Sequence, residues 1–577
     1  MATTDRPKAR QSQLVTTYGV GSLFPAGDQS FMICGIDDWD ERSSPSIEEP
    51  RLARSMGVAH FRGPSSGRSS GDVPAVRFPE MHYCPNCRRL APFWKFNSKS
   101  MTCDAPECED RDLTPSRFVA CCEDGHIEDF PYFAWVHRGA PSTGGSHLLR
   151  IETRGASSSL ADIEIHCSCG VRPYNLEGSF SRMALREIKP CSGRRPWLPG
   201  ARDDACGKPL RVLQRGSANV WFAAMQSAIS IPPWSSPDAK FVTKYWPMLQ
   251  YMPDDPLRDT VSQMIAESRS ESLTVQGIVD AVRQRKGLAT TAAPTDDSLR
   301  DEEYRALVDG NDGASLDTFR CIQVAVHPAI RRFIGQVSVV PRLREVRALA
   351  GFTRVTAAPT ATASPAIAKL SHQRVNWLPA TEVLGEGIFV RLDESVVKGW
   401  ESESLASLRA GALASAIDAR NISTGDVAVT PPTARFLAVH SIAHALMVEL
   451  SLDAGYPVGS LRERIYAGEG QAGILLYTAS SDSAGSLGGL AALGQAASFA
   501  RALSAAVSRA GWCSNDPVCA ESGPSGSDGL NLAACHACLL VPETSCEHRN
   551  IYLDRVTLVG WTDGTNGGLF DKIGAIT

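Results

Sequence analysis

The sequence has no long apolar run, no strong excess of one charge and no secretory leader. None of its 577 residues lies in a stretch approaching the roughly 18–20 uninterrupted apolar residues of a membrane span. A net charge of −5 excludes a globally basic nucleic-acid coat, so any nucleic-acid contact needs a local patch or a partner. The opening residues MATTDRPKARQSQLV have no apolar run behind their charges, which favours a cytoplasmic protein.

Motifs of an ATP-driven motor or a serine hydrolase are also missing. The segment from Gly200 to Lys208 comes nearest to a phosphate-binding P-loop, but its spacing is wrong. Pro209 stands where a P-loop has the Ser or Thr that holds Mg²⁺. No Gly-x-Ser-x-Gly elbow occurs in a convincing strand–helix setting. These absences favour a protein that is not itself an enzyme.

The length and composition predict a multidomain α+β protein. The residues are 43% hydrophobic and 21% charged, as in ordinary globular proteins. We expect a zinc-knuckle or zinc-ribbon N-terminal region, a helical middle and a mixed α/β C-terminal domain. The four predicted divisions are an N-terminal segment (1–83), a zinc-binding region (84–215), a mostly helical region (216–375) and the C-terminal domain (376–577). The first division includes a flexible Ser/Gly/Pro-rich loop at 43–75, and the third includes linkers near 290–297 and 354–366.

The 17 cysteines carry most of the information, because most of them occur in close pairs. In a reducing compartment such pairs are metal ligands more often than disulfides. The clearest spacing is Cys84-Pro-Asn-Cys87, followed after 15 residues by Cys103 and Cys108. Two close pairs at this separation can place four thiolates around one Zn²⁺.

A second zinc site is predicted from Cys167, Cys169, Cys191 and Cys206, although its last two ligands are spread out. Between the two predicted sites lies Cys121-Cys122-Glu-Asp-Gly-His126. These residues either form a third N-terminal site with groups elsewhere, or Cys122 replaces one of the assigned ligands.

The C-terminal region holds five cysteines for four positions. Cys535-His-Ala-Cys538 is one half of a site, and Cys519 with either Cys546 or Cys513 supplies the other. The favoured set leaves out Cys513. Together the clusters predict about three Zn²⁺ ions in closed, structural sites.

His440 and His444 are four positions apart on a helix expected over 433–450, so both lie on one face. A zinc-protease motif would need Glu beside the first histidine, where this chain has Ser441. Packing histidines are therefore favoured over a metal site, with Glu463 as a possible third ligand. The alternative function is a metal-dependent nuclease or hydrolase using His440 and His444.

A basic stretch at 186–215 is the candidate nucleic-acid surface. Cations held near a zinc site, together with an aromatic ring able to stack on a base, would suit single-stranded DNA. An ordinary solvated basic face explains the same composition. The candidate contacts are Arg186, Arg194, Arg195, Trp197, Lys208, Arg211 and Arg215.

Several long strings resemble one family. HSIAHALMVELSLDAGYPVGSLRERIY and LNLAACHACLLVPETSCEHRNIYLDR resemble a helicase-associated domain at the C-terminus of Mrf-type DNA-repair helicases. The same domain occurs in the DrmB family of DISARM phage-defence systems. HYCPNC and FVACCEDGHIEDFPYFAWVHRG also resemble that family, so the resemblance extends over most of the chain.

The resemblance implies a function that the residue patterns alone do not. In this family the C-terminal domain carries a four-cysteine zinc site, which would fall here on Cys535, Cys538, Cys546 and Cys519. It implies a non-catalytic subunit that binds a separate DrmA-like helicase and helps it engage foreign DNA, single-stranded or tailed. A zinc scaffold with protein–protein contacts only is a further alternative.

Overall fold

The computed structural model describes most of the chain and divides it into two compact units. Unit 1 comprises 1–227 and 346–381, and unit 2 comprises 228–345 and 382–577. The described residues are 8–65, 72–140, 146–155, 159–201, 206–268, 273–290, 293–312, 318–357, 367–424, 430–478, 489–521, 523–526, 529–561, 567–571, 573–574 and 576.

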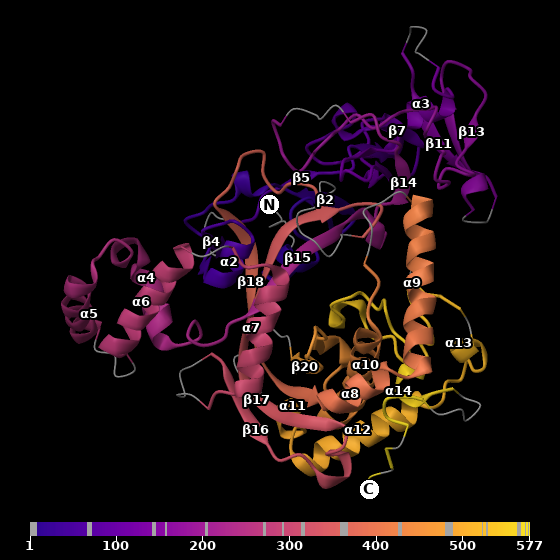
Figure 1. Ribbon diagram of the computed structural model, residues 1–577. Coiled ribbons are helices and arrows are strands. Elements are labelled where there is room, and N and C mark those ends of the chain that lie inside the picture. The colour runs from indigo at the N-terminus through magenta and orange to yellow at the C-terminus, as the bar shows by residue number, and fades with distance from the viewer. Residues whose placement is uncertain are drawn as a thin grey trace. The chain divides into compact units, whose positions relative to one another are not determined.

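The two units do not follow the linear division predicted from the sequence. The chain passes between them within three strands, β15 (Phe222–Ile229), β17 (Ile334–Thr353) and β18 (Trp377–Leu392), which Figure 1 shows. The four-part division therefore stays a prediction. Parts of the predicted loop at 43–75 and of both predicted linkers lie outside the described residues.

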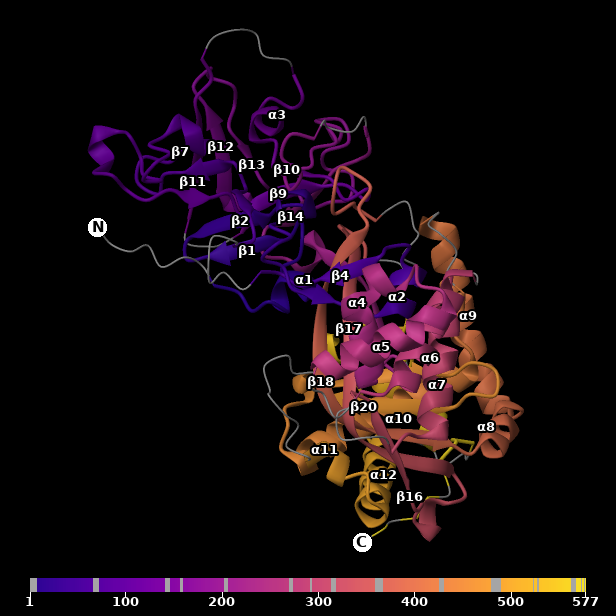
Figure 2. The ribbon, with the colours of Figure 1, turned by 90° about the vertical axis from the view of Figure 1, so that its left-hand side faces the viewer.

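Unit 1 contains three small antiparallel sheets with strand orders β1-β2-β5, β10-β9-β14 and β13-β12-β11-β7-β6-β8. Figure 2 shows part of the largest one. Its strands are β6 (Met81–Tyr83), β7 (Arg89–Pro92), β8 (Thr114–Pro115), β11 (Leu149–Thr153), β12 (Ile163–Cys167) and β13 (Tyr174–Asn175). The other two contain β1 (Leu23–Ala26), β2 (Gln29–Ile33), β5 (Ala75–Arg77), β9 (Phe118–Cys121), β10 (Ile127–Asp129) and β14 (Arg211–Gln214).

Alternating burial of side chains shows which face of a strand packs on the core of unit 1. In β12, Ile163, Ile165 and Cys167 are buried, while the residues between them are half-buried. Successive side chains of a strand point to opposite faces, so this pattern directs one face of β12 into the core of unit 1. Short helices α1 (Gln13–Thr16), α2 (Pro50–Ser55) and α3 (Tyr132–Val136) and the β3 (Ser46–Ile47)–β4 (His60–Arg62) pair complete the unit.

In unit 2 a sheet is covered by helices. Strands β19 (Leu461–Tyr466) and β20 (Gly473–Thr478) are antiparallel, and β20 also pairs with β18. Against them packs α10 (Ala434–Ala454), which in turn contacts α12 (Ala496–Ala510). The remaining elements are β16 (Arg320–Val324), α8 (Glu394–Glu401), α9 (Ser404–Thr424), α11 (Gly489–Ala492), α13 (Val518–Glu521) and α14 (Val556–Val559).

Helix α10 is the central element of unit 2. It begins after Thr433, whose hydroxyl accepts the N–H of Phe436, and ends at Gly455, which has φ = 71°. The helix is long and apolar enough to span a membrane, but 78% of its most apolar window is buried inside the fold. Its apolar composition is therefore that of a core helix, as predicted for 433–450.

The predicted helical middle is present, but strands lie within it as well. Helices α4 (Pro237–Leu249), α5 (Asp254–Ser268), α6 (Val275–Thr290) and α7 (Asp296–Asp309) follow one another, and the first three enclose their own apolar core. Strands β15 and β16 and the long strand β17 also lie within 216–375, where the sequence predicted mostly helix. Most residues of β17 are buried, on both faces of the strand, so it lacks the alternation of polar and apolar residues that is typical of a half-exposed strand. The fold is α+β and multidomain, as predicted.

Candidate metal centres

Cysteine, histidine and one glutamate form five compact groups in the described part of the chain. In each group four residues offer one donor atom apiece, and these atoms lie within 4.8 Å of one another. Sulfur ligands about 2.3 Å from a tetrahedral Zn²⁺ stand roughly 3.8 Å apart, so each group has the dimensions of a zinc site. We number them clusters 1 to 5.

Cluster 1 consists of Cys84, Cys87, Cys103 and Cys108, the set predicted from the sequence. The N–H of Arg88 donates to the carbonyl of Cys84 (2.9 Å), which closes a knuckle directly after β6. The Sγ atoms of Cys84 and Cys108 are 3.7 Å apart, and so are those of Cys87 and Cys103. The structure therefore brings the four predicted cysteines together, and zinc binding by this set stays a prediction.

Cluster 2 consists of Cys122, His126, Cys191 and Cys206. The first two lie in the turn between β9 and β10, where Gly125 has φ = 82°. The Sγ of Cys122 is 3.3 Å from Nδ1 of His126 and 3.9 Å from Sγ of Cys206. Cys122 and His126 thus share a group with Cys191 and Cys206, and the N-terminal region holds three groups, which agrees with the alternative of a third N-terminal site.

Cluster 3 consists of His137, His147, Cys167 and Cys169. Nε2 of His137 is 3.3 Å from Sγ of Cys169, and Nδ1 of His147 is 3.2 Å from Sγ of Cys167. Nδ1 of His137 lies 2.7 Å from the carbonyl of Phe133, so the proton sits on Nδ1 and leaves Nε2 for a metal.

The predicted grouping of Cys167 and Cys169 with Cys191 and Cys206 is therefore wrong. Cys167 ends β12 in the six-stranded sheet, whereas Cys206 lies shortly before β14, which belongs to a different sheet. Each pair completes its set with histidines or cysteines that the fold places beside it. Nothing in the spacing of the four cysteines revealed that they belong to two different groups.

Cluster 4 consists of Cys513, Cys519, Cys535 and Cys538. The Sγ of Cys513 is 3.5 Å from that of Cys535, and the Sγ of Cys519 is 3.8 Å from that of Cys538. The prediction that Cys546 is the fourth member and Cys513 the spare thiol is wrong. Cys513 follows directly on α12 and so lies beside the Cys535–Cys538 turn.

Cluster 5 consists of His440, His444, Glu463 and Cys546. The two histidines lie on the face of α10 that packs on β19, which carries Glu463. Oε1 of Glu463 is 3.0 Å from Nε2 of His440 and 3.3 Å from Nε2 of His444. The Sγ of Cys546 is 3.3 Å from Nε2 of His440. All four side chains are buried.

One thiol in each of three clusters has a lowered pKa. A hydrogen bond with Cys191 lowers the pKa of Cys122 to about 4, against the effect of burial. The backbone N–H of Val171 lowers the pKa of Cys169 to about 6. Burial raises the pKa of Cys535, but hydrogen bonds from its surroundings outweigh burial and lower the pKa to about 7. Because zinc ligands must be deprotonated, these pKa values favour metal binding.

Cluster 5 has a different electrostatic character. Burial opposes ionisation of Glu463, but His444 and His440 outweigh it and hold the pKa of this carboxyl well below its usual range. Burial and then Glu463 raise the pKa of Cys546 well above its usual range. The cluster therefore places an anionic carboxylate beside a thiol whose ionisation both burial and that carboxylate oppose.

Trp197 was predicted to stack on a nucleic-acid base, and that prediction is wrong. The side chain is only 1% exposed. Its indole N–H donates to the carbonyl of Lys369 (3.0 Å), and its ring packs on Phe352 at a centroid distance of 5.0 Å. The guanidinium of Arg354 lies over the same ring. Trp197 is thus part of the core of unit 1 and cannot reach a base.

The cations of the predicted basic stretch are divided between the surface and ion pairs. Arg194 donates two hydrogen bonds to the Glu80 carboxylate, at 2.9 and 3.1 Å. Lys208 pairs with Asp124 at 2.5 Å. Arg186 and Lys208 are exposed. The other four are half-buried: Arg194, Arg195, Arg211 and Arg215.

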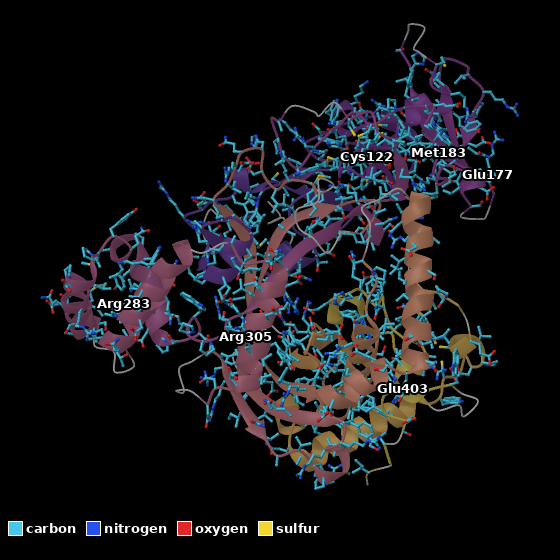
Figure 3. The ribbon with its side chains drawn as sticks, in the orientation of Figure 1. Cys122, Glu177, Met183, Arg283, Arg305 and Glu403 are labelled. Carbon is cyan, nitrogen blue, oxygen red and sulfur yellow. The ribbon has the colours of Figure 1, made fainter. Side chains whose placement is uncertain are left out.

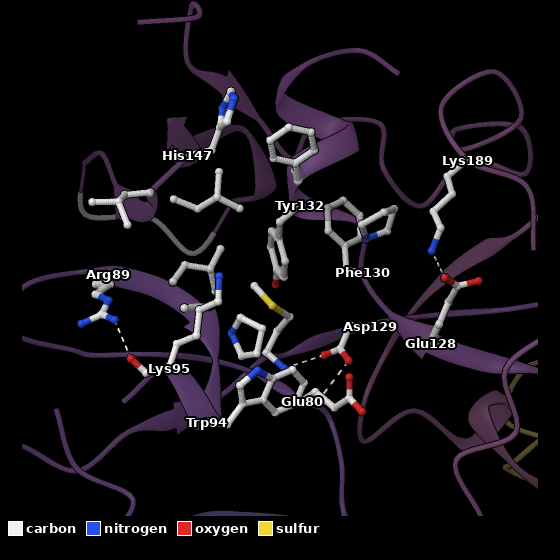
Figure 4. A pocket seen from close by; sticks show the side chains of 18 of the residues that line it. Glu80, Arg89, Trp94, Lys95, Glu128, Asp129, Phe130, Tyr132, His147 and Lys189 are labelled. Carbon is white, nitrogen blue, oxygen red and sulfur yellow. Dashed lines mark hydrogen bonds and ion pairs between the residues drawn. The ribbon is translucent and has the colours of Figure 1, made fainter. Parts of the chain in front are cut away.

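A cavity of about 380 Å³ lies in unit 1 between the six-stranded sheet and the segment after β10. Figure 4 shows Trp94, Lys95 and Arg89 together on one side of it, with Lys189 on the other. Trp94 is 53% exposed. Arg194 of the predicted basic stretch also lines this cavity. The exposed aromatic ring beside the cations is therefore Trp94, which the sequence analysis did not single out.

Sequence analysis named His126, His440 and His444 as candidates but missed His137 and His147 of cluster 3. The chain has only 12 histidines, and five of them lie in clusters 2, 3 and 5. A scarce residue type recurring near cysteine pairs was a usable signal. His137 and His147 follow the first cysteine-rich segment and precede Cys167, but they are ten positions apart and show no standard ligand spacing.

Comparisons with known proteins agree with these sites. Residues 442–539 match the MrfA Zn-binding domain, and residues 10–222 match a domain of unknown function (DUF8724). The DISARM protein DrmB of Bacillus paralicheniformis is 31% identical over 572 residues, which cover 94% of this chain and 99% of that relative. The chain belongs to the DrmB family of DISARM proteins. The predicted resemblance is thereby confirmed.

The match to the MrfA Zn-binding domain also indicates which metal binds. All four cysteines of cluster 4 lie within the zinc-binding match of this DrmB-family chain, whereas Cys546 lies beyond its end. Zinc as the cofactor is confirmed by this domain and by the Cys/His clusters, which accommodate three or more ions. All twelve predicted cysteine ligands lie in one of the five clusters.

Proposed function

We propose that this DrmB-family protein is a zinc-stabilised, non-catalytic subunit of a bacterial anti-phage complex of the DISARM type. The similarity to a DISARM DrmB protein over 94% of this chain and 99% of the relative carries the proposal. Similarity of that extent covers both units rather than one portable module. The cytoplasm, where foreign DNA must be met, is the compartment in which it acts.

The proposed partner is a separate DrmA-like helicase. The sequence has no P-loop, so ATP-driven movement on DNA has to come from another chain. Its C-terminal domain resembles one that Mrf-type helicases carry next to their own motor. We infer that the domain here docks on a motor supplied in trans and helps it engage single-stranded or tailed DNA.

Clusters 1 to 4 are proposed to hold one structural Zn²⁺ each. All four have four protein donors and thus no open coordination position for a substrate. Cluster 1 clamps a knuckle between β6 and β7, and cluster 4 ties the end of α12 to α13 and the 535–538 turn. The chemistry that the ions would supply is cross-linking of short segments that are separate in the chain.

The subunit role predicts what co-purifies with the tagged protein from its native host. We expect a helicase in the eluate and an ATPase activity that DNA stimulates. Deleting the gene should restore phage plating to the level of a strain without the defence system. Recovery of the protein alone, with no ATPase and unchanged phage resistance after deletion, would contradict the proposal.

The DNA contact is proposed to involve the exposed cations of unit 1 together with Trp94. Neutralising two of them in Arg186→Gln/Lys208→Gln should weaken single-stranded DNA binding by the complex. The slope of log K against log salt is negative, and each lost phosphate contact reduces its magnitude by about 0.7. Trp94→Ala should weaken binding by about 1–3 kcal/mol per stacked base but leave the salt slope unchanged.

The matched control changes the same charge elsewhere. Arg305 on α7, labelled in Figure 3, and Lys398 on α8 are exposed cations of unit 2. Arg305→Gln/Lys398→Gln has the same net charge as the first variant, so equal losses from both would indicate a general charge effect. Unchanged affinity and slope in Arg186→Gln/Lys208→Gln would remove this surface from the proposal.

A further inference from the structure

Cluster 5 is a four-donor site that neither the zinc-domain match nor the predicted zinc sets explain. The match begins after His440 and ends before Cys546, so it contains only two of the four residues. His440, His444 and Glu463 are 0% exposed and Cys546 is 6% exposed. A group of polar side chains buried this deeply needs a physical reason.

The ring nitrogens of both histidines are oriented as in a metal site. Nδ1 of His444 lies 2.8 Å from the carbonyl of Leu539, and Nδ1 of His440 lies 3.3 Å from that of Tyr552. A carbonyl only accepts, so each Nδ1 carries the proton. Each Nε2 of the neutral rings then presents a lone pair to the centre of the cluster, as metal-bound histidines do.

The sulfur of Cys546 is prepared for negative charge. The backbone N–H groups of His548 and Asn550 donate to its Sγ, at 3.3 and 3.2 Å. In cluster 4 the N–H of Asn515 donates to Sγ of Cys513 at 3.5 Å in the same manner. Donors aimed at sulfur stabilise a thiolate, the form in which cysteine binds a metal.

One oxygen of the Glu463 carboxylate has no hydrogen-bond partner, and a bound cation would contact it. Both histidine contacts of Glu463 go to Oε1, while Oε2 is buried without a hydrogen-bond partner. Without a metal, the Glu463 carboxylate needs protons on the histidine rings to balance its charge, and Cys546 has to stay a thiol. One divalent cation neutralises the carboxylate and a Cys546 thiolate and satisfies all four donors, so the buried group carries no net charge.

We propose that His440, His444, Glu463 and Cys546 bind one Zn²⁺ in a closed, structural site. A borderline ion suits this mixture of nitrogen, oxygen and sulfur donors. The site fastens α10 to β19 and to the turn that follows Glu543–Ser545. Because the protein supplies all four ligands from the interior, no position is open for a substrate, and the hydrolase alternative at His440 and His444 loses its basis.

The zinc content of the purified full-length chain tests this site without reference to the defence role. With clusters 1 to 4 filled, native mass spectrometry and elemental analysis should find five Zn²⁺ per wild-type chain. Glu463→Gln, which keeps the shape but not the charge, and Cys546→Ser should each contain four. A buried histidine–glutamate ion pair without metal would leave the zinc content of both variants unchanged.

Cys321→Ser is the control, because Cys321 is a buried thiol of the same unit that belongs to none of the five clusters. It should retain five Zn²⁺. Should both cluster 5 variants fail to fold, the wild-type count still decides, since a wild-type maximum of four would overturn the proposal. Variants that fold and retain the wild-type zinc content would overturn it as well.

Discussion

Replacing Cys535 and Cys538 together by serine is expected to unfold the C-terminal part of unit 2. Both thiols belong to cluster 4, and Sγ–Sγ separations of 3.5 and 3.8 Å link them to Cys513 and Cys519. Structural zinc contributes roughly 10–16 kcal/mol of apparent binding free energy to folding. The stability of a whole domain is only about 5–15 kcal/mol, so loss of this ion should not be survivable.

The measurements are soluble yield, limited proteolysis and thermal unfolding of the purified chain. The variant should be found mainly in the insoluble fraction, and chelation of wild-type protein should produce the same protease-sensitive C-terminal region. Cys321→Ser again serves as the matched control, since it exchanges one buried thiol outside the clusters for a hydroxyl. A double variant as soluble and as protease-resistant as this control would show that cluster 4 holds no structural ion.

Replacing Arg464 by methionine is expected to destabilise unit 2 by about 3–5 kcal/mol, because it strands buried carboxylates without a counter-charge. Arg464 and Glu303 are both 0% exposed and are joined by hydrogen bonds of 2.6 and 2.9 Å. Glu345 lies 3.5 Å from the same guanidinium, and Glu547 lies 3.7 Å from it. Methionine fills similar volume, so loss of charge rather than of packing dominates the effect.

Denaturant unfolding, followed by a signal from unit 2, measures this loss. Arg320 and Asp312 provide the comparison, since their ion pair is 42% and 66% exposed at its two ends. Solvent screens such a pair, so Arg320→Met should cost about 0–1 kcal/mol. Adding Glu303→Gln to Arg464→Met should recover part of the stability. Equal effects of Arg464→Met and Arg320→Met would mean that burial does not strengthen the first pair.

Cluster 1 could be predicted completely because its ligands are local. Cys84 and Cys87 lie in one knuckle, and Cys103 and Cys108 follow closely, so sequence spacing stands in for distance in space. The same reasoning failed for Cys167 with Cys191, because the fold places Cys167 beside His147 and Cys191 beside Cys122. The spacing of close cysteine pairs predicts two ligands of a site. Which residues supply the other two depends on how distant segments pack together.

Trp197 and Trp94 show that local sequence also fails to predict which aromatic side chains are exposed. Both are tryptophans near basic residues and cysteine pairs, and composition does not distinguish them. The fold buries Trp197 against Phe352 and leaves Trp94 half-exposed at a cavity. Burial depends on residues far away in the chain, and no local pattern reports it.

The sequence by itself determined the fold class, the family, the zinc cofactor and nearly all the cysteines that line the candidate sites. Those properties follow from composition, local spacing and long shared strings. Only the tertiary structure decided which donors meet. His440 and Cys546 are 106 positions apart, and Glu463 reaches them from a strand between. Donors so distant in the chain converge only when α10 packs on β19, because burial of apolar surface drives that packing.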